Sequence, residues 1–443
     1  MRDIGIAMLV GVVFFATALI GFLMQHALLL GIVAFLVVLW SNEALPLGVV
    51  SLLPIVLFPL FGILDTEAVA QNYSTSIIFL FLGGFMLAIA IEKTGLHHYF
   101  STKLLNLFPK SATGIIYALA FSAALLSSIL NNTTVTLMLM PIALYLSSNA
   151  QLTIRFLLAT AYGASLGGIL TPIGTAPNLF LLGFLKGKGM EMLSFGEWVL
   201  LMAPVVGLML LIVPYILSLG VERECVKEVS TSIPILNTQQ KRLYAIIIVL
   251  ALLLIINTLL KQLYDFALDE KLILLSFGLL MFVPRVGFLT WEDTRNLPYE
   301  IVFLFGAGFS IAAAFGSTGL ASDIAGKLSF IADMPLFWMF LFAAFFVSFS
   351  TEVTSNTALT SIVVPIFYEI GKGMGSDGVV LLLIATVTAS YAFMLPIATP
   401  PNAIIMSSRL IPIKTMMYIG FKLNLIGIVI VATVGFLFWR VII

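Results

Sequence analysis

Residues 79–96 read FLFLGGFMLAIAIEKTGL, and residues 303–320 read FLFGAGFSIAAAFGSTGL. The second stretch lies 224 positions after the first, and ten of the 18 positions are identical. In the first copy the identical residues are Phe79, Leu80, Phe81, Gly84, Phe85, Ala88, Ala90, Thr94, Gly95 and Leu96. Similarity at a fixed offset is the sequence signature of a repeated structural unit, so this stretch predicts a chain built from two related halves.

The same offset, without a gap, also matches polar residues and prolines further along the chain. It aligns Asn132-Thr133 with Asn356-Thr357. The later matches are Pro172 with Pro396, Thr175 with Thr399, Pro177 with Pro401, and Asn178 with Asn402. The repeat therefore includes residues whose chemistry differs from that of ordinary apolar helix.

Composition indicates the class of protein. The 443 residues are 61% hydrophobic and only 9% charged, whereas soluble domains are roughly 45–50% apolar and roughly 25% charged. The 21 Lys and Arg balance the 21 Asp and Glu, so there is no basic field for nucleic acid. One cysteine, Cys225, and three histidines exclude a disulfide framework and a thiolate or histidine metal cage. We therefore expect an all-α polytopic membrane protein.

A transmembrane helix needs roughly 20 apolar residues. Eleven apolar runs are read as spans: 4–24, 27–40, 46–64, 76–96, 154–185, 197–219, 243–261, 271–289, 299–320, 378–409 and 415–440. The first run lacks a small-residue cleavage site, so we expect it to be retained rather than removed as a signal peptide.

Two further apolar stretches, 112–147 and 336–371, carry polar residues near their middle. Split there, each limb has about 15 residues, or about 22 Å of helix, which is too short to cross the hydrocarbon layer. We interpret both as re-entrant helical hairpins whose tips line a cavity near the midplane. The alternative is one ordinary span with a polar kink in each stretch.

The distribution of Lys and Arg predicts the orientation. With the N-terminus inside, these residues divide thirteen to seven in favour of the cytoplasm, leaving Lys422 uncounted in the last span. This favours a cytoplasmic N-terminus and an outside C-terminus. Five spans then separate equivalent points of the two halves, so the second half is inverted relative to the first. Inverted repeats with broken helices at the midplane are typical of secondary transporters.

These features predict five segments. They are 1–110, N-terminal scaffold spans; 111–221, a transport-type half with the first hairpin; 222–242, a polar cytoplasmic linker; 243–334, second scaffold spans; and 335–443, a transport-type half with the second hairpin.

Four short segments carry the candidate chemistry: the hairpin tips 131–134 and 355–358, and the proline-rich segments 171–178 and 395–402. Prolines unwind helix locally, which frees carbonyl oxygens for a hard cation and leaves helix N-termini with partial positive charge. Asn and Thr in single membrane helices often only join helices, but four segments matched by the repeat favour a binding site.

No Asp, Glu, Lys or Arg lies between Lys110 and Arg155 or between Asp377 and Arg409. A bound anion would therefore be held by dipoles, amides and co-bound cations, because a dianion in a low-dielectric pocket needs neutralisation.

The chain resembles the divalent anion:sodium symporter family over nearly its whole length. The most specific likeness is Ser390–Ile404, SYAFMLPIATPPNAI, which follows the family's signature segment. The resemblance implies sodium-coupled transport of C4-dicarboxylates such as succinate and malate, and in some members citrate or sulfate. It further implies a multi-pass protein of the cell membrane, surrounded by lipid, that acts as a homodimer by an elevator-like movement. Sodium would be the coupling ion, with no cofactor.

The family's site residues are carried over position by position. Those that would face substrate are Asn132, Thr133, Asn356, Thr357, Thr175, Thr399 and Pro400. One sodium site would comprise Ser127, Asn131, Asn132 and Gly174, and the other Thr351, Thr354, Asn356 and Ala398.

Some choices stay open at this point. The first tip reads Asn131-Asn132-Thr133 where the family usually has Ser-Asn-Thr, so Asn131 serves either substrate or sodium, and we favour sodium. Glu352 is either a proton-linked coupling group or a structural carboxylate bound by backbone amides, and we favour the second. A membrane-embedded enzyme is disfavoured because it would need Asp, Glu and His side chains clustered at membrane depth. A channel is disfavoured because the sequence shows no charged filter. A carrier of sulfate or another inorganic anion, or the membrane subunit of an anion-extruding pump, is the alternative function.

Overall fold

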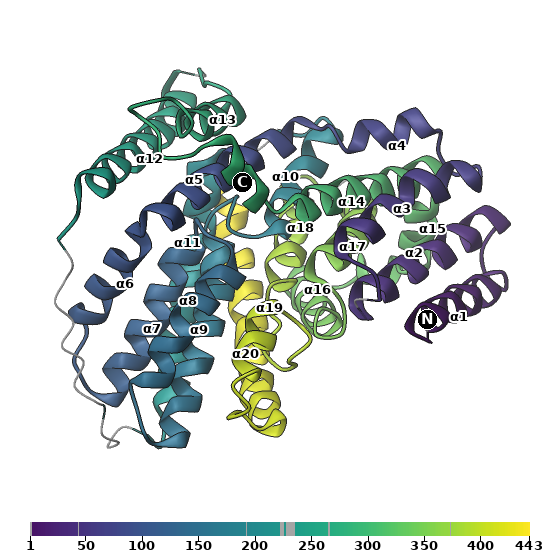
Figure 1. Cartoon of the computed structure of the whole chain (residues 1–443). Coiled ribbons are helices and arrows are strands. Elements are labelled where there is room, and N and C mark those ends of the chain that lie inside the picture. The colour runs from purple at the N-terminus through teal and green to yellow at the C-terminus, as the bar shows by residue number, and fades with distance from the viewer. Residues whose placement is uncertain are drawn as a thin grey trace.

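The fold is described from a computed structural model that covers residues 2–443, except 43, 192, 222–225, 227–234, 265 and 373. In this part of the chain, every regular element is a helix or a helical turn (Figure 1). The helices of the first half are α1 (Arg2–Ala18), α2 (Met24–Asn42), α3 (Leu47–Leu60), α4 (Thr66–Asn72), α5 (Ser76–Thr94), α6 (Leu96–Leu107), α7 (Ala112–Ser127), α8 (Asn132–Tyr145), α9 (Ala150–Leu170), α10 (Ala176–Gly187) and α11 (Phe195–Ser218).

The second half continues with α12 (Thr238–Tyr264), α13 (Glu270–Leu280), η1 (Trp291–Asn296), α14 (Tyr299–Thr318), α15 (Leu320–Lys327), η2 (Ser329–Ile331), α16 (Leu336–Ser350), α17 (Asn356–Gly371), α18 (Ser376–Thr388), α19 (Pro400–Met406), α20 (Ile413–Val434), η3 (Gly435–Trp439) and α21 (Arg440–Ile442). The all-α prediction is confirmed. The predicted linker 222–242 lies mostly outside the described residues and remains a prediction; its last residues, 238–242, are helical and form the start of α12.

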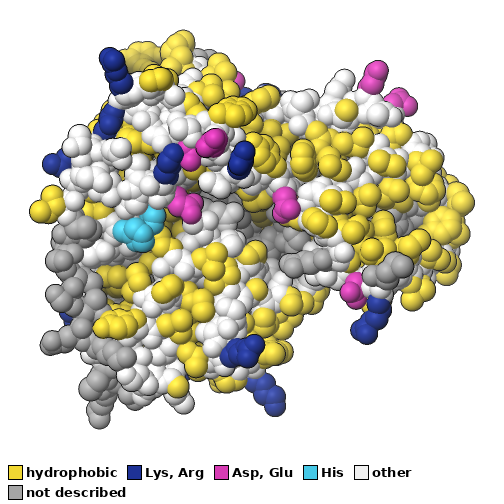
Figure 2. All heavy atoms as spheres, viewed as in Figure 1, with side chains coloured by type: hydrophobic (Ala, Val, Ile, Leu, Met, Phe, Trp, Pro, Cys, Tyr) yellow, Lys and Arg dark blue, Asp and Glu magenta, His cyan; other side chains and the backbone are white. Residues whose placement is uncertain are grey.

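Length and apolar composition support several membrane crossings. Within the described residues, seven helical stretches are long and apolar enough to span: 24–42, 66–94, 150–170, 195–218, 238–261, 299–318 and 413–442. Among the other predicted spans, α3 has 14 residues and α13 has 11. The exact count of eleven spans remains a prediction. Figure 2 shows hydrophobic side chains spread over much of the face in view, with few charged ones, as a lipid-facing surface requires.

The helices fall into two groups in Figure 1. Helices α7, α8, α9 and α11 run roughly upright at the left, whereas α2, α3 and α14 run across the right-hand side. In the first group α7, α8 and α11 all pack against α9, and in the second α3 packs against α14. Small residues allow the closest approach, since a Cβ at Gly167 on α9 would lie 2.1 Å from the Ala124 carbonyl oxygen on α7.

Each predicted hairpin is a pair of short helices joined by a few residues. Helices α7 and α8 have 16 and 14 residues, and α16 and α17 have 15 and 16. These lengths correspond to about 21–24 Å, less than the ~30 Å hydrocarbon layer. Their limbs are thus as short as the hairpin interpretation requires, and their re-entrant placement remains a prediction.

The helix that follows each hairpin is broken at its prolines. Helix α9 ends at Leu170, and α10 begins at Ala176, so five residues are irregular in the first half. In the second half α18 ends at Thr388 and α19 begins at Pro400, which leaves eleven irregular residues. Proline is tolerated in the first turn of the new helix, where its missing N–H would have no partner in any case.

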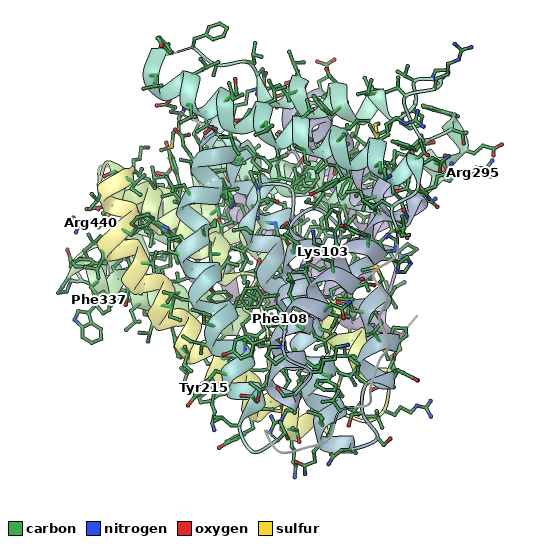
Figure 3. All side chains as sticks on the ribbon, turned by 90° about the vertical axis from the view of Figure 1, so that its left-hand side faces the viewer. Lys103, Phe108, Tyr215, Arg295, Phe337 and Arg440 are labelled. Atoms are coloured by element: carbon green, nitrogen blue, oxygen red, sulfur yellow. The ribbon has the colours of Figure 1, made fainter. Side chains whose placement is uncertain are left out.

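The second hairpin is held by contacts near the C-terminus. Figure 3 shows Arg440 and Phe337 at the same edge of the molecule. The Arg440 guanidinium pairs with Asp377 of α18 at 2.6 Å, and the Phe337 ring of α16 packs edge-on against Phe436 with centroids 5.8 Å apart. Residues 436–440, which follow α20, therefore contact both α16 and α18. Helix α18 ends where the second break begins.

Candidate functional site

A cavity of about 690 Å³ lies where the two hairpin tips and the two broken helices meet. All seven predicted substrate residues line it: Asn132, Thr133, Thr175, Asn356, Thr357, Thr399 and Pro400. Six of the eight predicted sodium ligands line it too, namely Asn131, Asn132, Gly174, Thr354, Asn356 and Ala398. The other two, Ser127 and Thr351, are fully buried and contact the lining residues Asn132 and Asn356 from behind.

Helix N-termini converge on this cavity. Helices α8, α10 and α17 begin at Asn132, Ala176 and Asn356, and these three residues all line it. Each N-terminus carries roughly half a positive charge from its unpaired N–H groups. Three of them supply about +1.5, so this part of the wall attracts an anion without any basic side chain.

Close oxygen pairs lie beneath the second tip. The Thr351 hydroxyl oxygen lies 2.7 Å from Asn356 Oδ1 and 2.8 Å from the Ala389 carbonyl oxygen. A hydroxyl has one proton and donates to only one of them. The remaining contact is satisfied by a cation, or by the Asn356 amide turned to present its NH₂ group. Hydroxyl, amide and carbonyl oxygens are the donor types with which transporters hold sodium at unwound helices.

The first tip repeats one of these contacts. The Ser127 hydroxyl oxygen lies against Asn132 Oδ1, as the Thr351 hydroxyl oxygen lies against Asn356 Oδ1. A Cβ placed on Gly168 would lie 2.8 Å from Asn132 Oδ1 and 3.2 Å from the Gly174 carbonyl oxygen, so two predicted ligands lie beside a position where no side chain fits. The residues present therefore suit a sodium ion at each tip.

The predicted ligand Thr354 behaves differently, since its hydroxyl donates to the Ser350 carbonyl oxygen at 2.9 Å, within its own chain segment. Ala398 lines the cavity. No group of three or more His, Cys, Asp or Glu side chains that could hold a metal occurs in the described part of the chain.

Asn131, where the first tip departs from the family pattern, caps a helix. Its side-chain oxygen accepts a hydrogen bond from the Thr133 N–H at 2.8 Å, at the start of α8. Its repeat partner Ser355 makes no such bond. An amide oxygen has two lone pairs, so capping leaves room for a cation contact on the same atom.

Two repeat-related asparagines hold the breaks in shape. Asn178 donates from Nδ2 to the carbonyl oxygens of Gly168 and Thr171 at 2.9 and 2.8 Å. Asn402 donates in the same way to Ala392 and Leu395, at 2.9 and 3.0 Å. Both side chains are fully buried. They replace the backbone donors that the prolines remove, as irregular backbone at membrane depth demands.

Glu352 is bound by backbone amides, as favoured from the sequence. Its two oxygens accept from the N–H groups of Met394 and Leu395, each at 2.9 Å, and one also accepts from Asn424 Nδ2 at 2.6 Å. Only 3% of the residue is exposed. Glu352 thus connects the second tip to the longer break and to α20, and it does not line the cavity.

The opposite wall was not anticipated. It comprises the end of α2 with Trp40, the start of α3 with Leu47, part of α5 with Phe85, and the start of α14 with Glu300. The Ala389 carbonyl oxygen and Gly168 were also missed. A backbone carbonyl carries no residue-specific signal, whereas Gly168 could have been suspected from its place beside the first break.

Comparison with known proteins agrees with this arrangement. A family model described as "Citrate transporter" matches residues 35–389. Proteins named sodium-dependent dicarboxylate transporter SdcS are similar over most of their length. The one from Staphylococcus saprophyticus is 29% identical over 428 residues, covering 89% of this chain and 82% of the relative. The one from Staphylococcus aureus strain bovine RF122 / ET3-1 is 31% identical over 429 residues, with the same coverage.

Two solved structures share the fold. MtrF of Neisseria gonorrhoeae, from a class described as antimetabolite efflux pumps, has a TM-score of 0.62 at 15% identity, covering 84% of this chain and 83% of that chain. The YdaH transporter of Alcanivorax borkumensis has a TM-score of 0.57 at 16% identity, covering 83% and 86%. The relatives and these neighbours are transporters, which confirms a carrier rather than an enzyme. The chain is therefore a multi-pass membrane protein of the citrate transporter family and one of the divalent anion:sodium symporters.

Proposed function

We propose that this protein is a sodium-coupled secondary transporter of divalent organic anions, with C4-dicarboxylates such as succinate and malate as substrates. The observation that carries the proposal is the cavity, where three helix N-termini meet oxygen clusters and no basic side chain lines the described wall. The name of the similar staphylococcal proteins, sodium-dependent dicarboxylate transporter, supports the same substrate class.

Charge balance explains why sodium would be required. A dicarboxylate brings two negative charges into a cavity in which α8, α10 and α17 each supply roughly half a positive charge, while the Glu300 carboxylate adds a negative one. Desolvating the dianion there is costly unless cations enter with it. Sodium at the two oxygen clusters would neutralise the substrate, so binding of the two becomes mutually dependent, as linkage requires.

Substrate contacts would come from the tips. The amides of Asn132 and Asn356 and the hydroxyls of Thr133 and Thr357 supply neutral donors on two sides of the cavity. Its volume of about 690 Å³ lies within the range of ordinary small-molecule sites. Thr175 precedes α10, whose N-terminus is available for a second carboxylate. Thr399 precedes α19, which begins with two prolines and whose Asn402 N–H donates to the Thr399 hydroxyl oxygen, so at this position the side chains rather than the backbone would face the substrate.

The test is uptake by purified protein in proteoliposomes without nucleotide. We expect labelled succinate to accumulate under an inward sodium gradient and not when potassium or choline replaces sodium. Equal uptake in all three salts, without a proton gradient, would refute sodium coupling. Uptake of sulfate alone would move the assignment to an inorganic anion carrier, and uptake only with ATP and a partner would indicate a pump subunit.

Citrate is the second candidate, because the matching family is described as a citrate transporter. Competition by unlabelled citrate and malate against labelled succinate separates the two. A substrate ranking with citrate first would replace the dicarboxylate assignment while leaving sodium coupling in place.

We further propose that the hairpin-bearing wall moves as a unit against the wall formed by α2, α3, α5 and α14, within a homodimer with a cytoplasmic N-terminus. In a Cys225→Ser background, a single cysteine at Ser355 would report this movement. Sodium and succinate should change its labelling by a membrane-impermeant maleimide applied from one face. Labelling from the same face at the same rate in every condition would contradict the movement.

A further inference from the structure

Glu300 is a charged residue in a cavity that otherwise lacks charge. Among the described residues of the lining it is the only ionisable one. It is exposed, and it forms no ion pair with any Lys or Arg that the structure describes. A carboxylate facing an anion site without a cation beside it needs a reason.

Its position differs from that of the other helix starts at the cavity. The residues that begin α8, α10 and α17 there are neutral, and their N-termini attract anions. Helix α14 also presents its N-terminus, because Glu300 and Ile301 both line the cavity. Glu300 adds a full negative charge to an N-terminus worth roughly half a positive one, so this wall is net negative.

Two observations argue against a residue placed only to stabilise α14. First, the repeat partner of Glu300 is Ser76 at the start of α5, and the Ser76 hydroxyl accepts a hydrogen bond from Lys186 Nζ at 2.5 Å. The equivalent position of the first repeat is thus neutral with a cation beside it. Second, α3 presents Gly48 to the Glu300 stem, and a Cβ there would lie 3.3 Å from Glu300 Cγ.

We propose that Glu300 is a specificity-determining residue that filters substrates by charge. It favours dianions over trianions such as fully ionised citrate, and it raises the local concentration of sodium. This inference rests on the proposed function, since it assumes that the cavity binds the anion.

The size of the effect follows from the cavity. Glu300 lines the same cavity as the hairpin tips, so about 10 Å serves as an order-of-magnitude separation between its carboxylate and a bound anion. At that distance, an effective dielectric between about 20 and 80 makes each added negative charge cost about twofold to about 20-fold in affinity. Neutralising Glu300 therefore improves trianion binding more than dianion binding by that factor, and it weakens sodium binding.

The experiment is equilibrium binding of labelled succinate and citrate to the full-length protein in nanodiscs, at about pH 8 and saturating sodium. Glu300→Gln should raise the ratio of citrate to succinate affinity by about twofold to about 20-fold. It should also raise the sodium concentration for half-maximal binding. Both changes should shrink when choline chloride is added, because salt screens the interaction. Glu300→Asp keeps the charge and should keep the wild-type ratio.

A matched control comes from α4, where Glu67 occupies the same second position of a helix and is also exposed, but does not line the cavity. Glu67→Gln should leave unchanged both the ratio of citrate to succinate affinity and the sodium concentration for half-maximal binding. The charge filter is overturned if the wild-type protein binds both anions but Glu300→Gln has the wild-type ratio of citrate to succinate affinity. It is likewise overturned if Glu300→Gln loses the same factor of affinity for both anions. Neither result contradicts the proposed function. Failure of the wild-type protein to bind either anion in sodium overturns the proposed function, and the filter with it.

Discussion

Replacing Thr351 with valine removes one oxygen from beneath the second tip and keeps the shape of the side chain. In the structure this hydroxyl is buried and lies 2.7 Å from Asn356 Oδ1 and 2.8 Å from the Ala389 carbonyl oxygen. Its loss leaves a buried acceptor without a partner, which costs about 1–3 kcal/mol. If that cost falls on the sodium-bound state, sodium affinity drops about 5- to 150-fold.

The assay is the initial rate of succinate uptake into proteoliposomes as a function of sodium, with unfolding temperature measured on the same samples. Thr351→Ser retains the oxygen and should stay close to wild type. Thr386→Val is the matched control, because Thr386 is equally buried but donates only to the Leu382 carbonyl oxygen within α18. Both valine variants should lose some stability, and only Thr351→Val should need more sodium.

The reasoning is refuted if Thr351→Val shows the wild-type sodium requirement while its unfolding temperature falls as in Thr386→Val. That outcome would mean that the hydroxyl only joins the hairpin to the break. Substrate affinity must be compared at saturating sodium, because a changed sodium affinity otherwise moves the apparent substrate affinity as well.

Three other predictions follow from local geometry. Gly167→Ala should destabilise the protein by about 1–3 kcal/mol, because the new methyl group would lie 2.1 Å from the Ala124 carbonyl oxygen. Thermal unfolding in detergent measures this change. An unchanged unfolding temperature would contradict the close packing of α7 on α9. Asn131→Ser should change stability by less than about 0.5 kcal/mol, because serine caps helices about as well as asparagine. We expect its sodium requirement to shift while substrate ranking at saturating sodium stays the same, and a changed ranking would instead assign Asn131 to substrate. Burial raises the pKa of Glu270, outside the predicted span 271–289, from 4.5 to about 7, so its contribution to stability is present below about pH 4.5 and is lost as pH rises towards 7. Glu270→Gln should flatten that part of the pH profile of the unfolding temperature, and an identical profile would disprove it.

Local chemistry made much of the site predictable. Single prolines such as Pro141 lie inside helices here, but Pro172 and Pro396 stand in clusters with further prolines, and each of these removes a backbone donor, so the breaks could be placed from the sequence. The tips could be placed because Asn132 and Asn356 interrupt apolar runs at matched positions of the repeat. Once both features belong to one repeated unit, a shared cavity is the natural expectation, and all seven predicted substrate residues line it.

The start of α12 and the two breaks show what sequence patterns leave open. Polar residues up to 242 predict a linker, and α12 begins at Thr238 within that range, because polar side chains also suit the first exposed turn of a helix. The breaks differ in length, five residues against eleven, although their prolines match. In the second half Glu352 satisfies the N–H groups of Met394 and Leu395, and this long-range contact lets the chain stay irregular for longer.

The class, the repeat and the residues of the tips and breaks could be predicted from the amino-acid sequence, because these depend on composition, backbone chemistry and spacing within one segment. Which backbone oxygens join these residues, and which side chains face them, depends on packing between segments that are distant along the chain. The Ala389 carbonyl oxygen is chemically like every other carbonyl and acquires significance only by lying 2.8 Å from the Thr351 hydroxyl. Glu300 resembles any acidic residue in the first turn of a helix. It becomes a candidate filter only because packing of α14 on α3 turns that helix start towards the cavity.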